Sequence, residues 1–522
     1  MFFPTLVQDY LTLAAQKHPE KIALICGEER WTYSAIDQDS NQLAAALGNM
    51  GLHRGDRVVV FLDNSVESVI SLYGILKASG VFVIVNGDLK ARKLAFILKD
   101  AGAQILITQT SKAAIVREAL EGSEIDAKVI WKGAAESIPQ DLAHRSKSWN
   151  AIFTTPDDDA QIAKIQSKCI DLDLAALIYT SGSTGEPKGV MSTHHNMLSA
   201  ARSIVQYLEN REDDIILNVL PLSFDYGLYQ VIMCVIFGGT VVLEKSFLYI
   251  HSILSRIAKE QVTGFPIVPT ILAMILKLED VSKYKFDSLR YITNTGAALP
   301  VEHIRKLRAQ FPDVQIYSMF GLTECKRVCY LPPHEIDRHP DSVGIAMPNC
   351  EVFIVDENGE EVEPNKVGEL VIRGSNVMQG YWNAPELTAK YYKPGKSERE
   401  RLLYSGDYFK KDEHGYLYFL GRKDDMIKCK GERISAREIE NLLHEINGVT
   451  EAAVIGVPDE ILGQAIKAYI VAYENSVTDK DILKFCTDNL EPFAVPKYIE
   501  FVESLPKSPH GKIDKKLLAT TA

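Results

Sequence analysis

Segments that fit β-strands alternate with segments that fit amphipathic helices over much of the first 420 residues. The first units are a strand at 57–62 before a helix at 65–79, a strand at 81–85 before a helix at 94–101, and a strand at 104–108 before a helix reaching 121. Residues 214–243 repeat the pattern. This alternation predicts βαβ units on largely parallel sheets. Because ligands of such folds bind at the carboxyl ends of strands, site residues are expected in the loops after strands.

The pattern changes near residue 420, at the charged turn 421–425, and the segment beyond it has strands of its own at 451–455 and 466–471. A chain of 522 residues also exceeds the size of a single core. We therefore predict an α/β fold. Residues 1–423 form a large N-terminal domain of βαβ-type sheets with flanking helices, and residues 424–522 form a small α+β domain joined to it by a hinge.

The composition excludes several classes of protein. A net charge of −12 argues against nucleic acid as the main partner, because phosphate binding needs a clustered basic surface. No apolar run reaches the roughly 18 residues of a membrane-spanning helix, and the first ten residues lack the positive flank of a signal peptide. Eight cysteines are too sparse for a disulfide framework. We expect a cytoplasmic protein without a membrane partner.

One loop, residues 179–189, predicts a phosphate site. It follows an apolar strand at 175–179 and combines glycines, hydroxyls and one cation: Thr180, Ser181, Gly182, Ser183, Thr184, Gly185 and Lys188. Glycines allow close backbone approach, and exposed N–H groups and hydroxyls bind anionic oxygens. Pro187 distinguishes the loop from a Walker A motif. A flexible linker is the alternative, which the embedded hydroxyls and Lys188 disfavour.

A second segment, residues 318–324, follows an expected strand at 314–316. Phe320 offers a ring that stacks on a base, Thr323 a hydroxyl for a phosphate, and Glu324 an oxygen ligand for Mg²⁺. The alternative is a plain helix cap, with Thr323 capping and Glu324 in the first turn.

Together with the segments 404–407, 421–424, 431–434 and 509–514, these loops resemble the ordered motifs of the adenylate-forming superfamily. That superfamily contains acyl-CoA synthetases, adenylation domains of nonribosomal peptide synthetases, and firefly luciferase. The resemblance extends from near the start of the chain to Lys512. It implies that the chain uses ATP and Mg²⁺ to convert a carboxylic acid into an acyl-AMP, releases pyrophosphate, and passes the acyl group to a thiol.

The resemblance also implies roles for individual residues. Lys512 corresponds to the signature lysine, and a cation is needed there because an anionic carboxylate must attack an anionic phosphate. Thr323 and Lys188 join it as catalytic residues, and Glu324 as the metal ligand. The nucleotide-binding positions implied in addition to the first loop are Gly296, Ala297, Ala298, Ser318, Phe320, Gly321, Asp407 and Arg422, with Asp407 at the ribose hydroxyls. The hinge and thiol-access positions are Asp424, Gly431 and Arg433.

The loop 220–227 lies where the superfamily builds its acyl pocket. Asp225 matches the carboxylate that pairs with the α-ammonium of amino-acid substrates, although it can also simply cap the following helix. The other implied pocket residues are Tyr226, Tyr229, Met319, Val328 and Cys329, an apolar lining suited to a small apolar amino acid. For Lys326 and Arg327 the plain expectation is that they face solvent.

Residues 321–331 resemble stand-alone proline-activating ligases of nonribosomal peptide biosynthesis and secondary metabolism. This narrower resemblance implies L-proline as substrate and a separate peptidyl carrier protein that brings its phosphopantetheine thiol, since the chain after Lys512 is too short for a carrier domain. Two alternatives stay open: an acyl-CoA ligase for a fatty or aryl acid, and a non-catalytic scaffold with the same fold.

Overall fold

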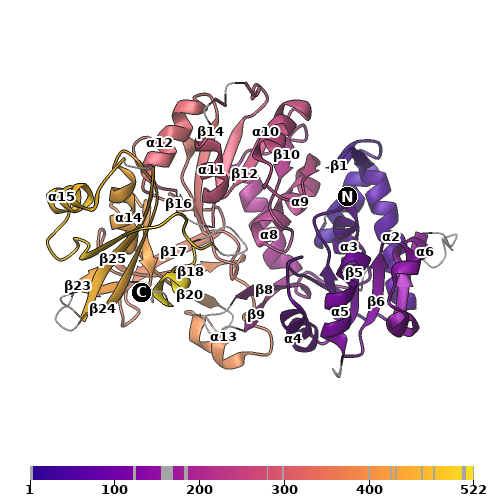
Figure 1. The fold of residues 1–522 in the computed structure, drawn as a ribbon. Helices are drawn as coiled ribbons and strands as arrows, with labels where there is room; N and C mark the ends of the chain where they lie inside the picture. The colour runs from indigo at the N-terminus through magenta and orange to yellow at the C-terminus, as the bar shows by residue number, and fades with distance from the viewer. Residues whose placement is uncertain are drawn as a thin grey trace.

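A computed structural model describes residues 4–121, 125–153, 168–181, 186–278, 280–281, 283–296, 299–397, 400–423, 426–429, 432–459, 463–473, 476–507 and 513–520. Within these residues the chain forms four β-sheets with helices packed on them (Figure 1). The first half of the chain, indigo to magenta in Figure 1, lies apart from the last hundred residues, which are coloured orange to yellow. The large and small domains that were predicted are therefore confirmed as an architecture.

The first sheet has the strand order β7-β6-β5-β3-β4-β8-β9. Its strands are β3 (Arg57–Phe61), β4 (Val81–Ile84), β5 (Ala103–Gln109), β6 (Lys128–Lys132), β7 (Ser146–Ser148), β8 (Leu174–Ser181) and β9 (Pro187–Thr193). The helices of this region are α2 (Tyr33–Asn49), α3 (Val66–Lys77), α4 (Ala91–Ala101), α5 (Ala113–Leu120) and α6 (Trp149–Phe153). The pairs from β7 to β8 are parallel, which confirms the βαβ prediction, but β8 and β9 form an antiparallel hairpin.

The second sheet has the order β16-β15-β14-β13-β12-β10-β11-β1-β2. Its strands are β1 (Ile22–Cys26), β2 (Glu29–Thr32), β10 (Ile215–Asn218), β11 (Thr240–Leu243), β12 (Gly264–Ile267), β13 (Tyr291–Asn294), β14 (Gln315–Phe320), β15 (Cys329–Tyr330) and β16 (Ile345–Ala346). Its helices are α1 (Val7–Lys17), α8 (His194–Tyr207), α9 (Asp225–Phe237), α10 (Ile250–Lys259), α11 (Pro269–Leu276) and α12 (Val301–Gln310). The pairs from β14 to β1 are parallel.

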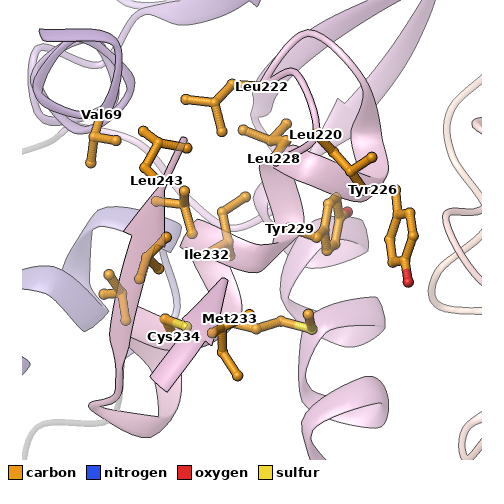
Figure 2. Packing of buried hydrophobic residues seen from close by; sticks show 14 of the residues in the cluster. Val69, Leu220, Leu222, Tyr226, Leu228, Tyr229, Ile232, Met233, Cys234 and Leu243 are labelled. Atoms are coloured by element: carbon orange, nitrogen blue, oxygen red, sulfur yellow. The ribbon is translucent and has the colours of Figure 1, made fainter. Parts of the chain in front are cut away.

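Helix α9 is buried along nearly its whole length. Figure 2 shows Ile232, Met233 and Cys234 of this helix packed together with Leu243 of β11 and Val69 of α3. A helix that is apolar on all sides is stable only inside a core. The helix ends where Gly238 adopts a left-handed conformation, with φ +77°. This rigid setting fixes the position of Asp225, the first residue of α9.

Residues 350–422 form a third sheet that is antiparallel: β17 (Cys350–Val355), β18 (Gly368–Gly374), β19 (Tyr392–Pro394), β20 (Arg401–Lys411) and β21 (Leu417–Arg422), with the helix α13 (Pro385–Tyr391). The extension of the βαβ pattern to residue 420 was wrong here. Side chains at the turns explain the difference: Oδ1 of Asp412 accepts hydrogen bonds from the backbone of His414 and Tyr416. Such turns bring consecutive strands back as hairpins.

The small domain contains β22 (Ile427–Cys429), β23 (Glu432–Ile434), β24 (Val449–Asp459), β25 (Gly463–Ala472) and β26 (Tyr498–Phe501), with α14 (Ala436–His444), α15 (Asp479–Asn489) and α16 (Lys515–Thr520). It has a hydrophobic core of its own. It contacts the large domain where the rings of His303 on α12 and His444 on α14 lie 5.0 Å apart. In the part of the chain that is described, no helix has both the length and the apolar character needed to cross a membrane.

Candidate active site

Three parallel strands of the second sheet carry predicted site residues at one edge. Asp225 follows β10, Gly296 follows β13, and Gly321 follows β14. Gly296 has φ +88°, a conformation that glycine adopts without strain. Strand β14 is longer than expected, so Ser318, Met319 and Phe320 belong to the strand and not to the loop after it. Because these carboxyl ends lie at the same edge, the structure brings the predicted positions Asp225, Gly296 and Gly321 to one edge of the sheet.

The loop after β14 turns back tightly on itself. A Cβ atom on Gly321 would lie only 2.3 Å from the carbonyl oxygen of Lys326, so no larger residue fits at position 321. Lys326 adopts a left-handed backbone with φ +65°, which is uncommon for a side chain of this kind. The buried amide of Asn376 donates to the carbonyl oxygens of Cys325 and Arg327, at 3.0 and 2.9 Å. These contacts fix the backbone of the loop.

Lys188, Glu324 and Tyr381 form one group although they lie far apart in sequence. Lys188 lies in β9, opposite Thr180 of β8, and its Nζ atom is 4.5 Å from the centre of the Tyr381 ring. The hydroxyl of Tyr381 donates to Oε1 of Glu324 at 2.6 Å. Burial lowers the pKa of Lys188, and the nearby Glu324 carboxylate opposes that shift. The structure thus joins the two predicted motifs through a tyrosine that the sequence analysis missed, because no glycine or charge marks its position.

The third sheet brings Asp407 and Arg422 together. They are directly opposite in the β20–β21 ladder, and Nε of Arg422 donates to Oδ1 of Asp407 at 3.1 Å. The Asp407 side chain is buried, whereas that of Arg422 is 60% exposed. A carboxylate held in this way has the acceptor oxygens that two ribose hydroxyls need.

Phe320 contributes to an aromatic group that connects the second and third sheets. Its ring stacks on Phe419 at 5.6 Å and meets Phe409 edge-on at 4.9 Å. These contacts fix the ring orientation. Phe320 is only partly buried, so its ring is not enclosed by this group.

On the other side of the β14 loop, Asp225 already has a partner within the chain. Nζ of Lys326 lies 3.7 Å from Oδ2 of Asp225, and the two side chains are 1% and 9% exposed. Burial lowers the pKa of Lys326 to about 7, and the Asp225 carboxylate opposes this shift. The expectation that Lys326 and Arg327 face solvent was therefore wrong, since both are buried.

The predicted pocket residues separate into two groups. Tyr226, Tyr229 and Met319 belong to the core around α9, and Figure 2 shows the two tyrosine rings at one side of that cluster. Val328 and Cys329 instead pack with Ile354, Leu370 and other residues of the third sheet. Val328 and Cys329 thus belong to a different hydrophobic cluster from the residues around α9. The guanidinium of Arg327 lies 5.5 Å from the Tyr226 ring centre.

Two family models match the chain. The model described as AMP-binding enzyme covers residues 11–382, and the model described as AMP-binding enzyme C-terminal domain covers residues 438–512. The chain belongs to the AMP-binding enzyme family. The predicted adenylate-forming superfamily is thereby confirmed, and this AMP-binding enzyme is an AMP-forming ligase.

The AMP-binding enzyme is similar to several CoA ligases over nearly its whole length. A long-chain-fatty-acid–CoA ligase of Salmonella typhimurium is 30% identical over 537 residues, which covers 98% of this chain and 93% of that one. A ligase of the same name from Bacillus subtilis is 31% identical over 532 residues, covering 98% and 94%. The crystal structure of the anthranilate CoA ligase AuaEII in complex with anthranoyl-AMP has a TM-score of 0.88 at 27% identity, covering 99% and 98%.

The residues of the AMP-binding enzyme fit Mg²⁺. Adenylate-forming enzymes use ATP and Mg²⁺, and Glu324 supplies a carboxylate oriented by the Tyr381 hydroxyl. Mg²⁺ usually takes one or two carboxylates and completes its shell with water and substrate phosphates. Glu324, a carboxylate oriented by a hydroxyl and close to Lys188, meets that requirement.

Several predicted site residues lie outside the described residues: Gly182, Ser183, Thr184, Gly185, Ala297, Ala298, Asp424, Gly431 and Lys512. In the sequence, the first four lie between β8 and β9. Ser181 lies in β8 and Arg433 in β23. Thr323 lies between Gly321 and Glu324, half-buried in the loop after β14.

Proposed function

We propose that this AMP-forming ligase activates a carboxylic acid without an α-amino group and transfers the acyl group to the thiol of CoA. The observation that carries the proposal is the junction of Lys188, Tyr381 and Glu324, because it unites a cation, a carboxylate and the phosphate-loop hairpin at one edge of the sheets. That arrangement suits a nucleotide triphosphate with its metal.

In the proposed first step, an oxygen of the substrate carboxylate attacks the α-phosphorus of ATP. A carboxyl–phosphate bond forms, the bond to the bridging oxygen breaks, and pyrophosphate leaves. Asp407 holds the ribose, and Lys188 and Thr323 contact phosphate. Glu324 would hold Mg²⁺, which would supply positive charge to the phosphates. Lys512 supplies the cation between carboxylate and phosphate. Each of these roles is part of the proposal.

In the proposed second step, the small domain turns about a hinge at 423/424 so that Gly431 and its neighbours replace Lys512 at the site. The thiolate attacks the acyl carbon, the bond to AMP breaks, and a thioester forms. The relatives support CoA as acceptor. The ligases of Salmonella typhimurium and Bacillus subtilis, each matched across 98% of this chain, are named CoA ligases. A carrier-protein phosphopantetheine, which the sequence suggested, has no support from these relatives.

The geometry around Asp225 disfavours an amino-acid substrate such as proline. An α-ammonium inside the site needs a carboxylate partner, and the carboxylate of Asp225 is already paired with the buried Lys326. The fatty or aryl acid alternative avoids this conflict and agrees with the names of the relatives. We therefore replace the proline assignment with an acid that lacks the α-amino group.

ATP–pyrophosphate exchange tests the proposal. The purified protein is assayed with proline and with fatty, aryl and dicarboxylic acids, and CoA is then added to look for a thioester by mass spectrometry. We expect exchange with at least one acid that lacks an amino group, none with proline, and a CoA thioester. Exchange with proline alone would restore the amino-acid assignment. Exchange with no acid would support the scaffold alternative.

A further inference from the structure

The two buried cations after Glu324 have unequal partners. Lys326 forms an ion pair with Asp225 at 3.7 Å. Arg327, only 1% exposed, forms no ion pair with any residue that the structure describes. This small region, Asp225, Lys326 and Arg327, therefore contains two basic side chains and one carboxylate. A buried charge without a counter-charge is costly in a folded protein.

The hydrogen bonds of Arg327 satisfy only part of its guanidinium. Nη1 donates to Oγ1 of Thr295, and the Tyr207 hydroxyl also lies within hydrogen-bonding reach. Nε is buried without an acceptor among the described residues. The same holds for the hydroxyl of Tyr229, which is fully buried one helical turn after Asp225. Buried polar groups normally have partners, so these two atoms require an explanation.

The position of Arg327 indicates what the missing partner is. Thr295 immediately precedes Gly296, on the predicted nucleotide side, and Tyr226 immediately follows Asp225, on the predicted acyl side. The guanidinium thus lies between the ends of β13 and β14 and the start of α9. We infer that Arg327 binds a second anionic group of the substrate, and that the enzyme activates carboxylic acids that carry a further carboxylate. This inference rests on the proposed function.

The surrounding contacts make Arg327 suitable for this task. Its backbone is held by Asn376, so the side chain is oriented before a ligand arrives. An arginine fork binds a carboxylate through two parallel hydrogen bonds. Lys326 cannot substitute for it, because its ammonium is paired with Asp225. A purely apolar chain in the same place would leave the guanidinium unpaired, and sites with unpaired polar groups reject such analogues.

Matched pairs of acids test the inference in the wild-type enzyme. Butyrate and succinate, hexanoate and adipate, and benzoate and isophthalate differ mainly by one carboxylate. We expect kcat/KM in pyrophosphate exchange to be at least ~10-fold higher for the dicarboxylate in one or more pairs, the size of one charge-assisted hydrogen bond. A preference for the monocarboxylate in all three pairs overturns the inference.

Substitution of Arg327 tests whether this residue causes the preference for the dicarboxylate. Arg327→Met keeps the length and apolar contacts of the side chain, and we expect it to lower kcat/KM for the preferred dicarboxylate by ~10–10²-fold while leaving its monocarboxylate partner unchanged. Arg327→Lys keeps the charge and is expected to retain part of the preference. Arg256→Met removes another buried arginine, which lies in α10 and pairs with Glu244. It should leave the ratio of kcat/KM between the dicarboxylate and the monocarboxylate unchanged.

The outcomes separate this inference from the proposed function. An equal loss for both acids in Arg327→Met would mean that Arg327 contacts the reacting carboxylate or supports the fold, and it would overturn the inference alone. Wild-type exchange with no acid, or with proline only, would refute the proposed function and the inference together. If Arg327→Met does not fold, the acid pairs assayed with the wild type and with Arg327→Lys still test the inference.

Discussion

Nε of Arg422 donates to Oδ1 of Asp407 at 3.1 Å across the β20–β21 ladder, with Asp407 buried and Arg422 largely exposed. The arginine therefore helps to hold the carboxylate in place. The Asp407 N–H donates to Oγ of Ser405 at 3.1 Å, which also fixes the backbone at this point. A pre-oriented carboxylate suits a pair of vicinal hydroxyls.

Asp407→Asn tests the ribose assignment. The amide keeps the shape of the side chain but loses the charge, and one acceptor becomes a donor. We expect KM for ATP to rise by ~10–10²-fold in pyrophosphate exchange, because hydrogen bonds to a charged group contribute ~1.5–3 kcal/mol. Lys411→Gln, on the same strand and paired with Glu361 at the surface, is the control and should leave KM for ATP unchanged. An unaltered KM in Asp407→Asn would rule out ribose binding at this residue.

Tyr381→Phe removes only the hydroxyl that donates to Glu324. We expect the Mg²⁺ concentration for half-maximal exchange to rise by ~10-fold or more, because residues that orient a metal ligand typically affect affinity by ~10–100-fold. Tyr391→Phe is the matched control, since its ring also lies beside Lys188, at 5.4 Å. An equal Mg²⁺ requirement in both variants would show that Tyr381 does not orient a metal ligand.

The sequence predicted the parallel sheets from local periodicity, and it predicted site residues in the loops after strands. It did not anticipate the antiparallel sheet at residues 350–422, where hairpin turns set by residues such as Asp412 reverse consecutive strands. Asp407 and Arg422 were each identified from their motifs. Their direct pairing depends on the register of an antiparallel sheet that had not been anticipated.

The residues on the predicted acyl side show a second reason why the sequence alone does not predict every site residue. Charged residues in loops are usually exposed, so Lys326 and Arg327 were expected in solvent. Their burial results from the tight return of the loop over Gly321 and from the clamp by Asn376, a residue about 50 positions away in sequence. Val328 and Cys329, which the sequence grouped with Asp225, pack with residues of the third sheet. Contacts between segments that are distant in sequence determine whether such side chains are buried. No local sequence pattern indicates those contacts.

Lys512→Ala is expected to slow adenylate formation by at least ~10²-fold, the usual effect of removing one preorganised charge at a reacting group. Formation of the thioester from supplied acyl-AMP should largely survive, because in the proposed second step Lys512 is replaced at the site when the small domain turns. Single-turnover assays of the two half-reactions measure this directly. An equal loss in both steps would contradict the proposed division of work between the two domain positions.

Asp225 and Lys326 should be energetically coupled. Asp225→Ala leaves a buried ammonium without its partner, and breaking a buried ion pair in this way typically costs ~3–5 kcal/mol. We expect the double variant Asp225→Ala/Lys326→Met to be more stable than Asp225→Ala alone in urea denaturation. If the two substitutions are additive, the pair does not contribute to stability as a unit.

The histidine pair between the domains predicts sensitivity to acid. Burial lowers the pKa of His303 to about 4 and that of His444 to about 3, and the Lys306 ammonium acts in the same direction on both, while Glu451 opposes the shift at His303. In the unfolded chain both groups have a pKa near ~6.5. Above that pH both states are neutral and the pair makes no pH-dependent contribution. As the pH falls from ~6.5 toward about 4, the unfolded chain takes up protons that the folded chain resists, so stability is lost by up to ~1.4 kcal/mol per histidine per pH unit.

Thermal unfolding between pH 4 and pH 8 measures this loss. We expect the unfolding temperature of the wild type to fall steadily below pH 6.5, and we expect that fall to be shallower in His303→Gln/His444→Gln, because glutamine does not titrate. His334→Gln, whose side chain is 77% exposed, is the control and should follow the wild type. Parallel curves for the wild type and the double variant would show that the pair does not control acid stability. A shallower curve for the double variant alone would assign the acid sensitivity to the contact between α12 and α14, where the small domain rests on the large one.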